Sequence, residues 1–210
     1  MGLFVSFCFR DIVCYAFCTG LLQHSLEEVF NLTGMKRIVM VDEDDNPIGL
    51  EEKEKCHEGD GILHRAFLGM VFNDKCEILL ARRGQSKKLW PGWWDGTVAS
   101  HPSEGESYEQ AVARRLREEL GIEAREMKFL FKFRYQARYG AVGSENELCA
   151  VLAVRVGSDR ICPNPEEVSE VRFADPRKLA GEAAGLYCPW FLLALENIDL
   201  NPLEICESFS

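Results

Sequence analysis

The sequence predicts an α+β fold, in one domain that spans residues 35–205. Two observations support this class: short strand-like apolar runs recur along the chain, and one amphipathic helix stands between them. The chain of 210 residues is long enough to bury a sizeable hydrophobic core. Its 47% of apolar and 28% of charged residues are usual for a globular protein.

The predicted strands are short apolar runs bounded by turn-forming residues. The run at residues 42–47, DEDDNP, ends the first strand, and Asn73-Asp74-Lys75 joins the second and third at hairpin length. We expect strands at residues 37–41, 66–72, 77–81, 127–135, 148–156 and 168–173.

The clearest helix is predicted from Tyr108 to Leu120. Ser107 and Gln110 form the pattern of a capping box at its start, and Gly121 is a natural stop. The apolar residues at helical spacing define its buried stripe, namely Tyr108, Ala111, Val112, Leu116 and Leu120. The charged residues are therefore expected on the other face. A last amphipathic helix is expected at residues 189–195.

Residues 1–34 differ from the rest of the chain and form an uncertain N-terminal extension. They are rich in Phe, Leu and Cys, but Arg10 and Asp11 interrupt the apolar run, which argues against an integral membrane span. Gly2 and Ser6 match a loose myristoylation pattern. An over-extended reading frame, an amphipathic appendage and a targeting segment stay open as interpretations.

The formal net charge of -10 argues against a nucleic-acid partner, because nucleic-acid binders usually have a basic surface. A phosphorylated small molecule stays possible, since a local basic cluster or a bound metal inverts the field at a site. The nine cysteines are scattered and form no C-x-x-C pair. This pattern indicates reduced thiols in a cytoplasmic protein more than a disulfide framework.

Histidines and carboxylates form the first candidate cluster. His57 and His64 are seven positions apart, and His101 follows further along the chain. Glu145 and Glu147 stand at i and i+2, so both project from one face if the segment is extended. Two close carboxylates repel each other unless a cation or a shared proton relieves them. A metal site, structural histidines and a solvated acidic loop all stay open at this point.

Basic residues form the second candidate cluster. Four of them fall within seven positions, namely Arg82, Arg83, Lys87 and Lys88. In an acidic protein such a group is a plausible anion clamp, although a solvated face has the same composition. On the predicted helix, Arg114 and Arg115 each precede a glutamate by four positions, which is also the pattern of a surface ladder.

The segment ESYEQAVARRLREELGI, residues 106–122, resembles the Nudix box G-x5-E-x7-R-E-U-x-E-E-x-G-U, where U is apolar. The matching positions are Glu106, Arg114, Leu116, Glu118, Glu119, Gly121 and Ile122. Ser100 stands where the first Gly belongs, and Arg115 replaces a Glu that commonly serves Nudix hydrolases as metal ligand or base. The resemblance implies a Nudix-type α/β/α sandwich with a mixed β-sheet.

With an arginine at position 115, the chain resembles the type I isopentenyl-diphosphate delta-isomerases. This resemblance extends over residues 37–194. The matching motifs are H-x6-H from His57, R-R-x-x-S-K-K-x-W-P-G-x-W from Arg82, His101-Pro102, Phe133-Arg134-Tyr135, E-N-E from Glu145, and Pro189-Trp190. Because these motifs occur in one order with matching spacing, the chain is identified as a member of this family.

The resemblance implies a metal-dependent enzyme that isomerises isopentenyl diphosphate to dimethylallyl diphosphate. One divalent metal, Zn2+, Mn2+ or Mg2+, would be held by His57, His64, His101, Glu145 and Glu147. A Mg2+ on Glu119 would bridge the substrate's phosphates, which would be neutralised by Lys53, Arg83, Lys87 and Arg115. The implied catalytic residues are Tyr135 and Glu147, which protonate the alkene, and Trp190, which faces the developing carbocation.

One position departs from this family. Its catalytic cysteine lies two residues before the metal-binding His, where this chain has Ala99. Alanine cannot transfer a proton, and Ser100 points away from that position if the segment is a strand. Three interpretations follow: an isomerase in which water, Ser100 or the diphosphate is the second acid/base; a Nudix-type hydrolase of an isoprenoid or nucleoside diphosphate; or a weakly active paralogue that binds isoprenoid diphosphates.

Overall fold

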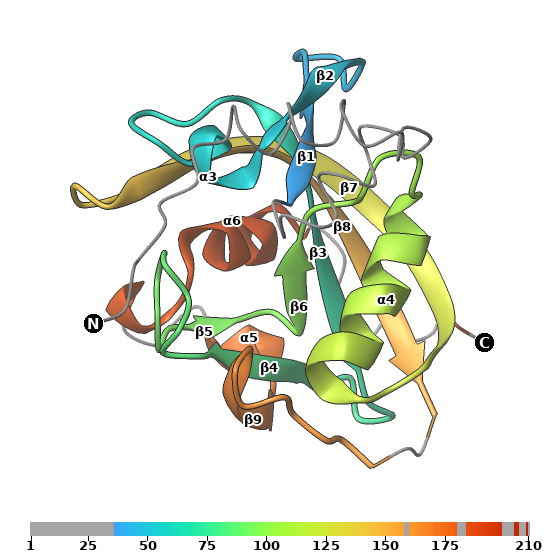
Figure 1. Cartoon of the computed structure of the whole chain (residues 1–210). Helices are drawn as coiled ribbons and strands as arrows, with labels where there is room; N and C mark the ends of the chain where they lie inside the picture. The colour runs from blue at the N-terminus through green and yellow to red at the C-terminus, as the bar shows by residue number, and fades with distance from the viewer. Residues whose placement is uncertain (1–35, 158–159, 180–183, 199–203, 206–208, 210) are drawn as a thin grey trace, which may run out of the picture. The chain divides into compact units, whose positions relative to one another are not determined.

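The computed structural model describes residues 36–210, apart from 158–159, 180–183, 199–203, 206–208 and 210. The expected extension, residues 1–34, lies outside the described residues. Within the described part, the helices and strands follow the α+β order that the sequence predicts (Figure 1).

The strands of the described chain pair into one mixed sheet (Figure 1). They are β1 Arg37–Val41, β2 Pro47–Glu52, β3 His64–Phe72, β4 Ile78–Arg83, β5 Trp94–Asp95, β6 Val98–Ser100, β7 Ala124–Tyr139, β8 Gly143–Val156 and β9 Val168–Ala174. Strand β3 runs parallel to β8 and antiparallel to β1, β4 and β6. Strands β7 and β8 form a long antiparallel pair. The predicted mixed sheet is confirmed.

The helices of the described chain are α3 Lys53–Cys56, α4 Tyr108–Leu120, α5 Pro176–Leu179 and α6 Pro189–Asn197, with a 3-10 turn at Ala184–Leu186. None of the described helices is long and apolar enough to cross a membrane.

Two hydrophobic cores lie on opposite faces of the sheet, and the side chains of β3 alternate between them. Leu68 and Met70 belong to the core that α6 covers, whereas Phe67 and Val71 belong to the core that α4 covers. The resulting order of layers is helix, sheet, helix (Figure 1). This is the sandwich that the sequence predicts.

Helix α4 has the predicted bounds and the predicted ends. Ser107 accepts a hydrogen bond from the backbone N of Gln110, the Gln110 side chain accepts one in return, and Gly121 ends the helix with a φ of 65°. The expectation that every charge of this helix faces away from the core is wrong for Arg115 and Glu119. Both are buried, because each is the other's ion-pair partner.

The β7–β8 hairpin extends further than predicted. Strand β8 begins at Gly143, so Glu145 and Glu147 lie in an extended segment and share one face, which confirms the condition set for them. Strands β2, β5 and β6 and helices α3 and α5 were not predicted, because each is short and lacks a repeating apolar pattern.

The cysteines of the described chain are not all reduced. Cys56, Cys149, Cys162 and Cys188 are free thiols, whereas Cys76 is disulfide-bonded. The expectation of reduced thiols is therefore wrong at Cys76. A disulfide requires proximity in the fold and no particular spacing in the sequence, so the sequence pattern could not exclude it.

Candidate active site

The five predicted metal-ligating residues converge at the end of the sheet where the parallel strands β3 and β8 begin. His64 opens β3 and is the register partner of Glu147 in β8. Glu145 precedes Glu147 by two positions, on the same face of that strand. His57 caps the C-terminal end of α3, and His101 directly follows β6. Four separate elements thus supply one cluster.

The side chains of this cluster approach one another closely. One ligand atom from each of the five residues lies within 4.8 Å of all the others. His57 Nε2 is 2.8 Å from Glu145 Oε2, and His64 Nε2 is 3.1 Å from His101 Nε2. Glu147 Oε1 is 3.1 Å from His101 Nε2. Apart from the partly buried His101, all of them are buried.

The hydrogen bonds of the Nδ1 atoms of His57 and His64 determine whether their Nε2 atoms carry a proton or a lone pair. The Nδ1 atoms of His57 and His64 lie 2.6 and 2.7 Å from backbone carbonyl oxygens, which only accept, so both Nδ1 atoms donate. In the neutral rings, the Nε2 lone pairs then face carboxylate oxygens. Oε2 of Glu145 is buried and meets no hydrogen-bond donor in the described chain. Lone pairs that face each other in this way fit a divalent cation at their centre.

Tyr135 connects this cluster to the hydrophobic core. It is the register partner of Glu147 across the β7–β8 pair, and its hydroxyl donates a hydrogen bond to Glu147 Oε2. Burial raises the pKa of Tyr135 well above its ordinary value, and the Glu147 charge adds to this. Burial also raises the pKa of Glu147, but the neighbouring His64 and the hydrogen bond from Tyr135 outweigh it and leave that pKa lowered. The pair is therefore a neutral phenol on an ionised carboxylate.

Trp190, the second residue of α6, stands beside Tyr135, with ring centroids 6.0 Å apart. Its indole Nε1 donates a hydrogen bond of 2.8 Å to Asp95 Oδ1. The guanidinium carbon of Arg83 lies 5.2 Å from the centroid of the same ring. Trp190 therefore lies next to both Tyr135 and Arg83.

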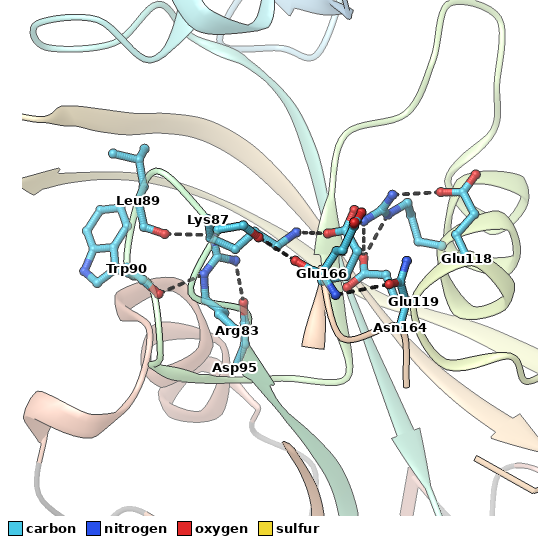
Figure 2. A network of polar contacts seen from close by, with 12 residues as sticks. Arg83, Lys87, Leu89, Trp90, Asp95, Glu118, Glu119, Asn164 and Glu166 are labelled. Carbon is cyan, nitrogen blue, oxygen red and sulfur yellow. Dashed lines mark hydrogen bonds and ion pairs between the residues drawn. The ribbon is translucent and has the colours of Figure 1, made fainter. Parts of the chain in front are cut away.

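Arg83 is held rigidly by main-chain and side-chain oxygens, as Figure 2 shows. Its Nε donates to the carbonyl of Trp90 at 3.1 Å, and one terminal nitrogen donates to the carbonyl of Leu89 at 3.0 Å. The other terminal nitrogen is 3.4 Å from Asp95 Oδ2. The guanidinium is therefore positioned before any ligand arrives.

Lys87 and Arg115 form ion pairs with two neighbouring carboxylates, those of Glu119 and Glu167. Lys87 forms an ion pair with Glu167. One terminal nitrogen of Arg115 lies 2.7 Å from Glu119 and 3.2 Å from Glu167. Burial raises the pKa of Glu167, but Lys87 and Arg115 outweigh it and lower that pKa to about 2. Glu167 is thus ionised and forms ion pairs with both Lys87 and Arg115.

One pocket is lined both by charged residues of this region and by Ala99. Its lining residues are Ala81, Arg83, Lys87, Asp95, Gly96, Thr97, Ala99, Glu119, Glu167 and Val168. Lys53 is not among them and is instead the first residue of α3. Burial lowers the pKa of His101, and the charge of Lys53 lowers it further. The structure therefore brings Arg83, Lys87 and Glu119 into one pocket, whereas Lys53 lies beside the histidines.

Ala99 and Ser100 occupy opposite faces of β6. Ala99 is the register partner of Leu68 and packs against the core that α6 covers. Ser100 pairs with Phe67, whose side chain lies in the core on the α4 side. Ser100 therefore does not present its hydroxyl where residue 99 presents its methyl group, as expected from the strand pattern.

Two carboxylates of this pocket were missed in the sequence. Asp95 is a lone acid after an aromatic run, and Glu167 lies in a stretch rich in glutamate. The only signal for Asp95 was a charge within a segment otherwise fit for burial. Glu167 carried no signal that sets it apart from its neighbours.

Comparison with known proteins agrees with these features. A family model described as NUDIX domain matches residues 62–189. The chain is 39% identical over 170 residues to an isopentenyl-diphosphate Delta-isomerase of Haloarcula marismortui, covering 77% of this chain and 90% of that protein. It is 40% identical over 161 residues to an isopentenyl-diphosphate Delta-isomerase of Photorhabdus laumondii, covering 75% and 91%.

Solved structures support the fold. A Deinococcus radiodurans protein has a TM-score of 0.64 at 20% identity and covers 79% of this chain and 100% of its own. A MutT protein of Methanosarcina mazei has a TM-score of 0.55 at 21% identity and covers 65% of this chain and 93% of its own. With the family model and the identity to curated relatives, the chain belongs to the isopentenyl-diphosphate Delta-isomerase family within the Nudix superfamily.

Proposed function

We propose that the protein is a divalent-metal-dependent isomerase that converts isopentenyl diphosphate to dimethylallyl diphosphate. The observation that carries this proposal is the Tyr135–Glu147 pair, which joins the five-residue metal cluster to Trp190. The names of the curated relatives give the same activity for those proteins. A phenol, a carboxylate and an aromatic ring in contact suit the protonation of an alkene.

In this proposal His57, His64, His101, Glu145 and Glu147 hold one divalent cation. The mixed nitrogen and oxygen donors suit Zn2+, Mn2+ or Mg2+. A cation bound there neutralises the two carboxylates and makes the hydrogen-bonded Tyr135 hydroxyl a stronger acid. The same five residues without a cation would leave two buried carboxylates facing lone pairs.

The diphosphate of the substrate is assigned to the pocket lined by Arg83 and Lys87, with Arg115 next to its lining residues Glu119 and Glu167. These three cations are in contact with four carboxylates, those of Asp95, Glu118, Glu119 and Glu167. Because the carboxylates outnumber the cations, a diphosphate needs an additional positive charge to bind here. Glu119 would hold a Mg2+ there, which would supply that positive charge for the diphosphate.

The proton moves from the Tyr135–Glu147 pair to the terminal alkene carbon of the substrate. Positive charge then develops on the neighbouring tertiary carbon, which faces the ring of Trp190 and is stabilised by its π electrons. Tyr135 and Trp190 are 5% and 3% exposed, so they keep water away from the cation.

One assay distinguishes the three interpretations that Ala99 leaves open. The purified protein is incubated with isopentenyl diphosphate and Mg2+, and dimethylallyl diphosphate and released phosphate or diphosphate are followed together. Isomer without phosphate is the expected result. Phosphate without isomer would instead identify a hydrolase. Neither product, with thermal protection by the substrate, would identify a binding protein.

A further inference from the structure

Asp95 is a buried carboxylate that lies between the two parts of the site and in none of the matched motifs. Its Oδ1 accepts hydrogen bonds of 2.8 Å from Trp190 Nε1 and from the backbone N of Gly96. Its Oδ2 is 3.4 Å from a terminal nitrogen of Arg83, as Figure 2 shows. Only 4% of the residue is exposed, and it lines the same pocket as Ala99.

In the binding mode proposed above, this position corresponds to one particular carbon of the substrate. Arg83 is assigned to the diphosphate and Trp190 to the tertiary carbocation. In isopentenyl diphosphate, the carbon that must lose a proton, C2, lies between the carbon bonded to the diphosphate oxygen and the tertiary carbon C3. A carboxylate that contacts both Arg83 and Trp190 is therefore level with C2.

Asp95 also approaches from a different side than the proton donor. Tyr135 and Glu147 come from β7 and β8, whereas Asp95 and Ala99 come from β5 and β6. Strands β6 and β8 pair with opposite edges of β3. Asp95 thus stands on the side where residue 99 offers no proton acceptor.

The surroundings of Asp95 leave it able to exchange a proton near neutral pH. The charged and titratable groups that face it are Arg83 on β4, Glu119 on α4, Cys149 on β8 and Cys188 ahead of α6. Burial raises the pKa of Asp95 to about 6, although Arg83 and the hydrogen bonds from Trp190 and Gly96 lower it. Burial raises the pKa of both thiols well above the ordinary value, so they remain neutral.

We propose that Asp95 is the general base of the isomerisation, an assignment that rests on the proposed function. The C2–H bond breaks, its electron pair forms the C2=C3 double bond and cancels the charge on C3, and the proton bonds to the Asp95 carboxylate. The Tyr135–Glu147 pair has already given one proton to C4. The substrate gains one proton and loses one, so no oxidant or further reactant is required. After product release Asp95 gives its proton to water, and the Tyr135–Glu147 pair regains a proton from water.

Asp95→Asn tests this assignment, because Asn is nearly the same size and keeps an oxygen for the Trp190 N–H while it removes the base. Isomerisation is measured with Mg2+ from pH 5 to 8 in wild type, Asp95→Asn and the double variant Asp95→Asn/Ala99→Cys. The matched control is Asp74→Asn, at an exposed carboxylate that also pairs with an arginine, Arg155.

The base acts when ionised, so wild-type kcat is expected to rise with pH through about 6 and then level. Asp95→Asn is expected to lose roughly 100-fold in kcat and the pH-dependent rise, with KM changed only a few-fold. In the double variant, the thiol at residue 99 is expected to raise kcat roughly tenfold above that of Asp95→Asn. The rise of kcat with pH is expected at a higher pH than in wild type. Asp74→Asn keeps the wild-type rate.

Retention of kcat and of the pH profile in Asp95→Asn, in active protein, would overturn the assignment of Asp95. So would a loss in Asp95→Asn that Ala99→Cys cannot restore, because a purely structural role predicts that result. A wild-type profile that is flat between pH 5 and 8 overturns it without any variant. Wild-type protein with no isomerase activity overturns the proposed function, and the assignment of Asp95 with it.

Discussion

Tyr135 and Glu147 stand directly opposite each other on β7 and β8, and the Tyr135 hydroxyl donates a hydrogen bond to the Glu147 carboxylate. The other oxygen of that carboxylate faces the histidines. A single side chain therefore connects a candidate metal centre with a candidate proton donor. This arrangement makes the contribution of each group separately testable.

Tyr135→Phe removes the hydroxyl and leaves the ring in place. We expect kcat of isomerisation to fall roughly 100-fold or more, with little change in KM, because a proton donor is lost and the diphosphate pocket is intact. Tyr139→Phe on the same strand is the control, since its register partner is Gly143 and not Glu147. Equal losses in the two variants would contradict the role of Tyr135.

Ala99→Cys places a thiol on the core side of β6. We expect isomerase activity to increase several-fold over wild type, because a second acid/base then supplements the site. Ser100→Cys is the matched control, as its side chain lies on the other face of the strand. An equal gain from both cysteines would show that position on the strand does not matter.

Metal removal should lower thermal stability, because the buried cluster then holds uncompensated carboxylates and lone pairs. At a metal concentration of about 100 times Kd, binding stabilises by about 2.7 kcal/mol. For a domain of this size we expect a rise in Tm of roughly 5–10 °C when Zn2+ or Mn2+ is added to chelator-treated protein. Elemental analysis of the dialysed sample identifies the bound ion.

Glu145→Gln should abolish this thermal shift, because it removes one ligand charge and oxygen from the cluster. Glu58→Gln changes a neighbouring exposed glutamate and should retain it. An undiminished shift in Glu145→Gln would place the metal elsewhere.

Arg115→Gln should weaken binding of inorganic diphosphate with Mg2+ roughly tenfold or more, because a buried guanidinium next to Glu119 is lost. Arg117→Gln on the same helix removes an exposed arginine that pairs with Glu123 and should have little effect. Titration calorimetry measures both. Equal affinities for the two variants would remove Arg115 from the diphosphate site.

Asp95 should cost stability at neutral pH. Its folded pKa of about 6 lies above the ordinary 3.8, so the folded protein binds this proton more tightly and loses stability as pH rises between these values. Asp95→Asn removes this dependence. In urea unfolding, the free energy of unfolding of the variant relative to that of wild type should therefore increase by about 1 kcal/mol or more between pH 5 and pH 7.5. A constant difference over this range would show that Asp95 does not titrate there.

Much of the local structure could be predicted because its signals are local. The cap at Ser107, the apolar stripe and Gly121 fixed the bounds of α4 without reference to the rest of the chain. The five candidate ligands could be named because the family motifs give their positions, although they come from four elements. Register alone then brings His64 and Glu147 together.

Burial of charge could not be predicted in the same way. Arg115 resembled one rung of a surface ladder, yet it is buried because Glu119 and Glu167 neutralise it. The contacts of Asp95 with Trp190 and Arg83 arise only when α6 and β4 pack around it. Such pairings depend on tertiary proximity, for which a sequence pattern carries no period or spacing.

The parallel pairing of β3 with β8 has a kinetic consequence. The chain between His64 and Glu147 must close into a long loop for those two residues to become neighbours, and such distant pairings form slowly. The set of candidate ligands is therefore complete only after this distant pairing has formed. A metal ion is therefore expected to leave the refolding rate unchanged and to slow unfolding. The bound metal would then prolong the lifetime of the folded protein without speeding its formation.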